Sequence, residues 1–162
     1  MQIDRTDIRI LEALQSNGRQ SNVELASAVG LSPSPCLARV RNLENSGLIS
    51  RYVALLDPEK LGPCVSVFIQ LSLEKQSDDE LSKFELAVRD MPEVMECYLM
   101  TGDADYLIRV LVRDTVHLRG FILDSLTKLR GIAQIRSSFA LKQVVYRTSI
   151  SLQAILPKSN SI

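Results

Sequence analysis

The chain has 162 residues, of which 46% are hydrophobic and 23% charged, a composition typical of a globular protein with one or two small domains. No apolar run approaches the ~20 residues of a membrane span, and the first residues do not resemble a signal peptide, so we expect a cytoplasmic protein. The formal net charge is zero, which does not favour nucleic-acid binding by bulk charge.

Cysteine and histidine are too sparse for a metal centre. Cys36, Cys64 and Cys97 lie far apart without a C-x-x-C pair, and His117 is the single histidine. A zinc site needs several such ligands at close spacing. We therefore expect no metal and no cofactor, and three reduced thiols.

The first predicted helix begins at Asp4. Asp4 can cap the helix, and Asp7 lies in the first turn, where the helix dipole favours a negative charge. Ile8, Leu11 and Leu14 recur at helical spacing, which predicts the buried face of this helix.

Residues 21–47 predict two short helices joined by a tight turn. Ser21 and Glu24 have the spacing of a capping box, and Gly30 is well placed to end the first helix in a left-handed conformation. Ser34 and Pro35 are expected to open the second helix as its cap and first residue. Together with the first helix, this pattern predicts a three-helix unit.

The second of these helices is predicted to bury Leu37, Val40 and Leu43. Its opposite side carries small polar residues, with an arginine on each flank. That pattern suits a recognition helix in the DNA major groove, with base edges at its centre and phosphates at its flanks. An ordinary helical hairpin with a solvated arginine face is the alternative. The candidate DNA contacts are Ser32, Ser34, Pro35, Ala38, Arg39, Arg41, Asn42 and Arg51.

Charge around this helix is locally positive. Residues 1–60 carry seven Lys or Arg and seven Asp or Glu, but between Cys36 and Arg51 three arginines meet only Glu44, a net charge of +2. Each subunit would therefore contribute a modest DNA contact, and tight binding would need two or more subunits on one site. Residues 48–56 are β-prone, which predicts a wing or an inter-domain strand.

The remainder of the chain predicts the order β-α-β-β-α-β, a ferredoxin-like fold. In chain order, the expected strands and helices cover residues 64–73, 77–91, 94–100, 106–112, 115–130 and 132–148. The fold class is thus α+β, with the domain plan 1–50 (helix-turn-helix), 51–63 (connecting strand and linker), 64–150 (βαββαβ domain) and 151–162 (a partly loose tail).

Both helices of this second domain must cover one face of its sheet and leave the other open. The strands nevertheless have apolar residues on both sides. A partly apolar bare face usually packs against another subunit, so we expect an obligate dimer that forms a higher assembly. The residues expected on the open face are Phe68, Leu107, Leu111, Ala140 and Val144.

Two passages together resemble the Lrp/AsnC (leucine-responsive, feast/famine) transcription regulators. LSPSPCLARVRNLENSGLISRYVALLDPEKLG is similar to their recognition helix and following strand, and TGDADYLIRV to the loop and strand of their effector domain. The resemblance implies a winged helix-turn-helix joined to a ligand-binding βαββαβ domain. It also implies dimers that pair their sheets and often form tetramers or octamers, with amino acids bound between dimers. Ala38 departs from the family, where a basic residue is common.

The TGDAD loop is the candidate effector site. Its flexible glycine exposes backbone N–H and C=O groups that can hold an α-carboxylate and an α-ammonium, and Asp103 or Asp105 would complete the ammonium contact. The alternative is a turn whose aspartates bond only their own backbone. The candidate effector contacts are Thr101, Gly102, Asp103, Ala104, Asp105 and Tyr106, with Ser137 and Ser138 facing the same cleft from a neighbouring subunit.

These observations predict a sequence-specific DNA-binding regulator whose assembly or DNA binding depends on a small amino acid at a subunit interface. One alternative is an amino-acid-sensing oligomer that acts through protein partners without DNA. A second is an enzyme using Asp103 and Asp105 as an acid/base pair. No nucleophile, metal ligand cluster or phosphate loop accompanies those carboxylates, so we expect no enzymatic activity. The sequence leaves the identity of the amino acid, the target genes and the oligomer size open.

Overall fold

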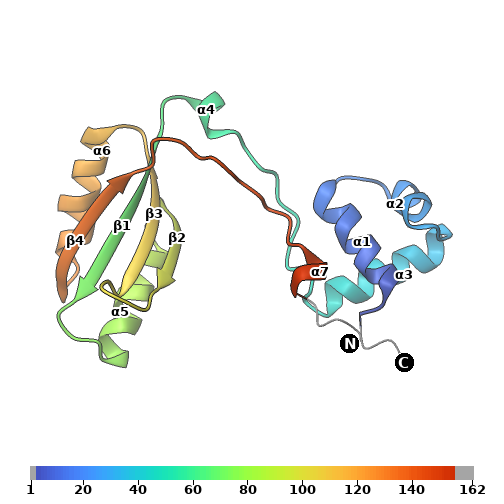
Figure 1. Ribbon diagram of the computed structural model, residues 1–162, viewed down its shortest axis with the longest axis horizontal. Coiled ribbons are helices and arrows are strands. Elements are labelled where there is room, and N and C mark those ends of the chain that lie inside the picture. The colour runs from blue at the N-terminus through green and yellow to red at the C-terminus, as the bar shows by residue number, and fades with distance from the viewer. Residues whose placement is uncertain (1–2, 156–162) are drawn as a thin grey trace. The chain divides into compact units, whose positions relative to one another are not determined.

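The computed structural model describes residues 3–155 (Figure 1). Contacts divide this part of the chain into two compact units, residues 3–55 together with 145–155, and residues 56–144. The C-terminal segment thus belongs by its contacts to the N-terminal unit. The sequence-based plan had assigned residues up to 150 to the second domain and residues 151–162 to a tail, of which 156–162 lie outside the described residues.

The N-terminal unit consists of three helices, α1 (Arg5–Ser16), α2 (Asn22–Val29) and α3 (Pro33–Asn45). Two capping boxes start α1 and α2, one from Asp4 and Asp7 and one from Ser21 and Glu24. Gly30 ends α2 with φ 70°, the left-handed conformation expected for it. The core between the helices is formed by Ile10, Leu11, Leu25, Ala26, Val29, Cys36 and Leu43.

The start of α3 differs from the prediction. Ser32 occupies the cap position and Pro33 the first helical position, so the helix begins two residues earlier than expected. Pro35 is accommodated because the third residue of a helix also has no intrahelical partner for its N–H. The buried face differs too: Cys36 is fully buried, whereas Leu37 is 38% exposed.

The strand predicted for residues 48–56 is absent. Residues 50–57 form neither helix nor strand, and the short helix α4 (Pro58–Leu61) follows. Tyr52, Val53 and Leu55 are about half exposed or more. β-prone residues form a strand only beside another strand, and none pairs with this segment in the described residues.

The second unit confirms the predicted β-α-β-β-α-β order. Strands β1 (Val65–Leu73), β2 (Val94–Leu99), β3 (Tyr106–Val112) and β4 (Ile132–Phe139) form one antiparallel sheet in the order β2-β3-β1-β4. Helices α5 (Asp78–Arg89) and α6 (Thr115–Gly120) cover one face of the sheet (Figure 1), and a π-helical turn (Phe121–Ser125) and a 3-10 turn (Leu126–Lys128) continue α6.

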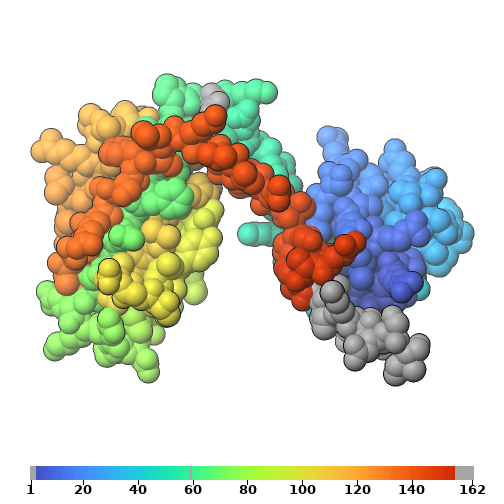
Figure 2. All heavy atoms as spheres, in the orientation of Figure 1, coloured from blue at the N-terminus to red at the C-terminus, as the bar shows by residue number. Residues whose placement is uncertain are grey.

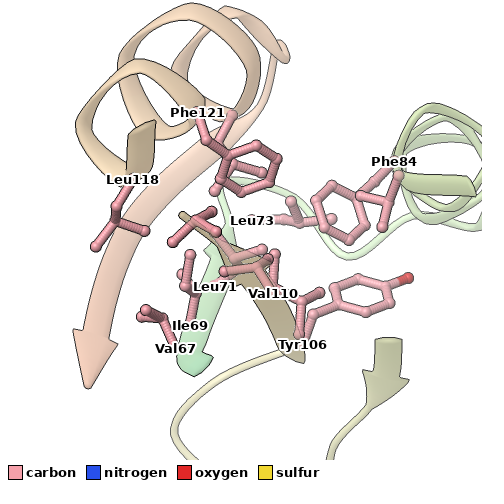
Figure 3. Packing of buried hydrophobic residues seen from close by; sticks show 13 residues of the cluster. Val67, Ile69, Leu71, Leu73, Phe84, Tyr106, Val110, Leu118 and Phe121 are labelled. Carbon is pink, nitrogen blue, oxygen red and sulfur yellow. The ribbon is translucent and has the colours of Figure 1, made fainter. Parts of the chain in front are cut away.

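The core of this unit lies between the sheet and its helices (Figure 3). Most inward residues of β1 and β3 are fully buried, whereas Leu86 of α5 is 61% exposed. The buried residues of α5 are Phe84 and Val88, four apart, and Leu86 lies midway between them and so on the other side of the helix.

The last strand, β4, is shorter than predicted and ends at Phe139, not near residue 148. Its partner β1 begins at Val65, so few β1 residues remain for β4 to pair with beyond Phe139. Residues 141–150 form neither helix nor strand, and the short helix α7 (Leu152–Ile155) follows.

The returning C-terminal segment is held on α1 by a pair of hydrogen bonds. The backbone N–H of Ile150 donates to Oε1 of Gln15 at 2.6 Å, and Nε2 of Gln15 donates to the carbonyl of Ile150 at 3.2 Å. Leu152 packs against the N-terminal core, where Figure 2 shows this segment in red beside the blue helices. Residues 150–152 are therefore an ordered part of the N-terminal unit.

Candidate functional site

The outer face of α3 is exposed and polar. Cys36 and Leu43 point into the core, and the residues on the opposite side of the helix are all exposed. Within the described residues, the side chains of Arg41 and Asn42 have no hydrogen bond or ion pair to the rest of the protein. This face therefore presents unsatisfied donors and acceptors on a rigid helix. Its exposed residues are Ser34, Pro35, Ala38, Arg41, Asn42 and Asn45.

Arg39 differs from Arg41 in both burial and partners. Nη1 of Arg39 donates to Oδ2 of Asp4 at 2.7 Å and to Oδ1 of Asp7 at 2.8 Å. The Asp7 side chain is 8% exposed, so its carboxylate is nearly buried. The backbone N–H of Asp7 and the guanidinium of Arg39 hold the pKa of Asp4 below its usual value. Arg39 thus bridges α3 and the start of α1.

The two ends of α3 are fixed by polar contacts with neighbouring segments. Near its start, Nδ2 of Asn22 donates to the carbonyl of Pro33 at 2.8 Å, while Ser32 makes no side-chain capping bond. Near its end, the hydroxyl of Tyr52 donates to Oε1 of Glu44 at 3.0 Å. Arg51 is exposed in the segment that follows.

The loop between β2 and β3 is anchored by Asp105. One carboxylate oxygen accepts from the backbone N–H of Leu73 at 2.7 Å and the other from Nε2 of Gln76 at 2.6 Å. The backbone N–H of Asp105 donates to the carbonyl of Leu71, and the carbonyl of Asp105 accepts from the N–H of Met100. The Asp105 carboxylate is therefore occupied by partners within the protein, although these are Leu73 and Gln76 and not the backbone of its own turn, as the alternative interpretation had it.

The outer part of the same loop is open. Thr101, Gly102 and Asp103 are exposed, and Ala104 is half-buried. Gly102 has φ 123°, a conformation that other residues rarely adopt. Among the described residues, the Asp103 carboxylate has no hydrogen-bond or ion-pair partner, and only its carbonyl accepts a bond, from Ser72. Of the two aspartates, Asp103 is the one available to a ligand.

Tyr106 belongs to the core. Its ring is fully buried beside Phe84, with ring centroids 4.4 Å apart (Figure 3). Its hydroxyl donates to Oε1 of Glu85 at 2.9 Å, and burial together with this bond raises its pKa. Tyr106 thus fixes the end of the loop from the helix side of the sheet.

The two serines of β4 do not converge on one cleft. Ser137 pairs with Ile69 of β1 and Ser138 with Phe68, and neighbouring residues of a strand point to opposite faces of the sheet. Ser138 therefore lies on the open face and Ser137 on the helix side. The prediction that both face the same cleft is wrong.

The open sheet face carries a polar network that the sequence pattern did not indicate. Nε and Nη2 of Arg109 donate to Oε1 of Glu96 at 3.0 and 2.7 Å, and the hydroxyl of Tyr98 donates to Oε2 at 3.0 Å. These bonds lower the pKa of Glu96, chiefly through Arg109. The network lies beside Phe68 and Leu107, so the open face is partly apolar and partly ionic.

The structure also contains a cavity of ≈ 440 Å³ that the sequence did not predict. It lies between α5 and β2 and is lined by side chains that include Glu85, Arg89, Met95, Cys97 and Leu99. Its residues come from separate elements, so no local motif marks it.

Within residues 3–155 no helix is long and apolar enough to cross a membrane. The same residues contain no group of three or more His, Cys, Asp or Glu side chains placed to hold a metal ion.

Comparison with known proteins gives a consistent result for both units. The family model for the Lrp/AsnC ligand binding domain matches residues 66–150, and that for a winged helix-turn-helix DNA-binding domain matches residues 3–50. The chain is 48% identical to the Bkd operon transcriptional regulator of Pseudomonas aeruginosa over 148 residues, which cover 91% of this chain and 97% of that protein.

Two further relatives extend the comparison. The leucine-responsive regulatory protein of Escherichia coli is 42% identical over 142 residues, covering 88% of this chain and 87% of that one. The crystal structure of the Neisseria meningitidis transcriptional regulator NMB0573 in complex with L-Met superposes with a TM-score of 0.90 at 41% identity, covering 96% of this chain and all of that chain. The two family models and the two curated relatives agree, and the chain belongs to the Lrp/AsnC family of DNA-binding transcriptional regulators.

Proposed function

We propose that α3 binds in the DNA major groove through its exposed outer face. The observation that carries this proposal is that Arg41 and Asn42 project from this face without an internal partner. An asparagine can bond adenine and an arginine can bond guanine or a phosphate. Ser32, Ser34 and Pro35 at the start of the helix would lie near the backbone, with Ala38 over the bases and Arg51 at a flanking phosphate.

We further propose that the DNA-binding form is a dimer. A chain of zero net charge gains little affinity from one recognition helix, and two helices on one duplex double the number of phosphate contacts. The open sheet face, with Phe68 37% exposed beside Leu107 and Leu111, supports pairing with a second copy. Assembly into tetramers or octamers, which the family resemblance implies, is part of the same proposal.

The effector in this proposal is a small amino acid held by residues 101–104. Asp103 is exposed and unpartnered in the described residues, so it is suited to bind the α-ammonium. The backbone groups around Gly102 would bind the α-carboxylate. The L-Met complex of the Neisseria relative supports an amino acid as ligand. An amino acid that binds one assembly or DNA-bound form better than another shifts the balance between them.

No catalytic role is assigned to Asp103 or Asp105 in this proposal. The relatives are described as transcriptional regulators, and Asp105 is occupied by Leu73 and Gln76. Since the function requires access to chromosomal DNA, we place the protein in the cytoplasm.

A mobility-shift titration tests the proposal. The wild-type protein first selects duplexes from a random pool, and binding to the selected duplex is then measured between 50 and 200 mM salt, with and without each of the twenty amino acids. We expect saturable binding that weakens steeply with salt, and one or a few amino acids that change the affinity or the size of the complex. Amino-acid binding without any retention of DNA would instead favour a module that acts through protein partners.

A further inference from the structure

The two arginines of α3 occupy different environments although they are two residues apart. At about 100° per residue they lie about 160° apart around the helix axis. Arg41 is exposed on the outer face, whereas the Arg39 side chain is 35% exposed and bound to Asp4 and Asp7. An arginine flanking a recognition helix is ordinarily assigned to a phosphate, so the pairing of Arg39 calls for a separate assignment.

The charge around Arg39 opposes a phosphate contact. One guanidinium and two carboxylates give this cluster a net charge of −1. A phosphate approaching Arg39 would meet both carboxylates within the range of unscreened repulsion, and it would have to compete with two short hydrogen bonds already made. The exposed Arg41 has no such competitor among the described residues.

The same cluster connects two helices that are distant in the sequence. Asp4 and Asp7 form the capping box of α1, in which each carboxylate also accepts from the other residue's backbone N–H, at 2.8 and 3.1 Å. The capping box thus holds both carboxylates in position by bonds that do not involve Arg39. A nearly buried Asp7 without its cation would be left uncompensated, so the cluster favours the arrangement in which Arg39 faces α1.

We propose that Arg39 is a positioning residue for DNA recognition and makes no phosphate contact. By binding Asp4 and Asp7 it fixes the rotation of α3 about its own axis, so that Ser34, Arg41 and Asn42 face outward. When Arg39 is lost, α3 can leave this orientation. The apparent affinity for DNA is then the wild-type affinity multiplied by the fraction of molecules that still present the outer face.

The salt dependence of DNA binding distinguishes the two roles. The slope of log K against log [salt] is negative, and each lost phosphate contact reduces its magnitude by about 0.9. Arg39→Gln and Arg41→Gln form a matched pair on one helix, measured on the duplex selected by the wild-type protein. For Arg41→Gln we expect the reduced slope and an unchanged Tm. For Arg39→Gln we expect an unchanged slope and a Tm several degrees lower. The affinity should be about tenfold weaker if about one molecule in ten keeps α3 in its wild-type orientation.

A second background isolates the partner carboxylates. In the Asp4→Asn/Asp7→Asn protein, Arg39→Gln should cause no further loss of affinity, because its positioning partners are already gone. A phosphate contact would still be lost in this background and the affinity would fall again. That result, or equal reductions of the slope by Arg39→Gln and Arg41→Gln, would overturn the proposal.

Circular dichroism establishes that each variant is folded at the binding temperature. Should Arg39→Gln not fold, Arg39→Lys replaces it, because lysine keeps the charge but cannot reproduce the guanidinium geometry. We then expect a lower Tm and weaker binding at an unchanged slope. A wild-type Tm together with weaker binding and a less steep salt dependence would instead indicate a phosphate contact and would overturn the proposal.

Discussion

Helix α3, the proposed recognition helix, and the loop between β2 and β3, which holds the proposed effector site, lie in different units. Each contains two like-charged residues spaced two apart. In α3, Arg39 binds Asp4 and Asp7 while Arg41 is exposed. In the loop, Asp105 binds the backbone of Leu73 and the side chain of Gln76, while Asp103 is exposed.

The difference between the members of each pair follows from burial. A charged side chain near the core must find partners there, because leaving water without compensation is costly. The exposed member keeps its hydration and is available for a ligand. Each proposed site therefore combines one charged residue that is bound within the chain and one that is exposed, and residue type alone does not distinguish the two.

The largest effect that tests this comparison is expected at Asp105. Asp105→Ala removes the acceptor for the N–H of Leu73 and for Gln76, and should cost about 1–3 kcal/mol of unfolding free energy. Asp103→Ala should change stability by less than about 0.5 kcal/mol and weaken amino-acid binding instead. Urea denaturation and a thermal-shift titration measure the two effects. Similar losses of unfolding free energy in both variants would contradict the distinction between a bound Asp105 and an exposed Asp103.

On the recognition helix, Asn42→Ala should affect base discrimination. If Asn42 bonds a base edge, its loss costs about 1–3 kcal/mol of preference at one base-pair position. Competition between the selected duplex and its single base-pair variants measures this preference. A uniform loss across all the duplexes would place Asn42 at the backbone.

A smaller effect is expected from the serines at the helix starts. Ser21 accepts a bond from the backbone N–H of Glu24, so Ser21→Ala should cost about 1 kcal/mol. Ser32 makes no side-chain capping bond, and Ser32→Ala should leave stability nearly unchanged. Denaturation midpoints compare the two, and the reverse order would contradict the assignment of caps.

The smallest effect concerns Tyr52 at the far end of α3. Burial, and then the bond to Glu44, raise the pKa of Tyr52 from 10.0 to about 12. A raised pKa in the folded state stabilises the protein below pH 10, and this contribution is lost as pH rises from 10 toward 12. Relative to Tyr52→Phe, the wild type should therefore lose stability above pH 10. Denaturation of both proteins from pH 8 to 11 measures it, and a constant difference would exclude the bond.

Much of the fold was predictable because its determinants are local. The capping box of Ser21 and Glu24 and the left-handed Gly30 follow from residues within a few positions of each other, and both are confirmed. The β-α-β-β-α-β order, predicted from the succession of strands and helices along the chain, is confirmed as well. The prediction of a strand at residues 48–56 was wrong because β-propensity alone does not provide a neighbouring strand to pair with. Strand β4 is shorter than predicted because few β1 residues remain to pair with it after Phe139.

The amino-acid sequence by itself determined most of the helices and strands and their order in the chain, since periodicity, caps and turns depend on near neighbours. Only the tertiary structure decided which charged residues of α3 and of the loop between β2 and β3 are bound within the chain. Asp4 lies 35 residues from Arg39, and Leu73 lies 32 residues from Asp105. Which charge is bound inside and which is free depends on burial and on partners that folding brings together.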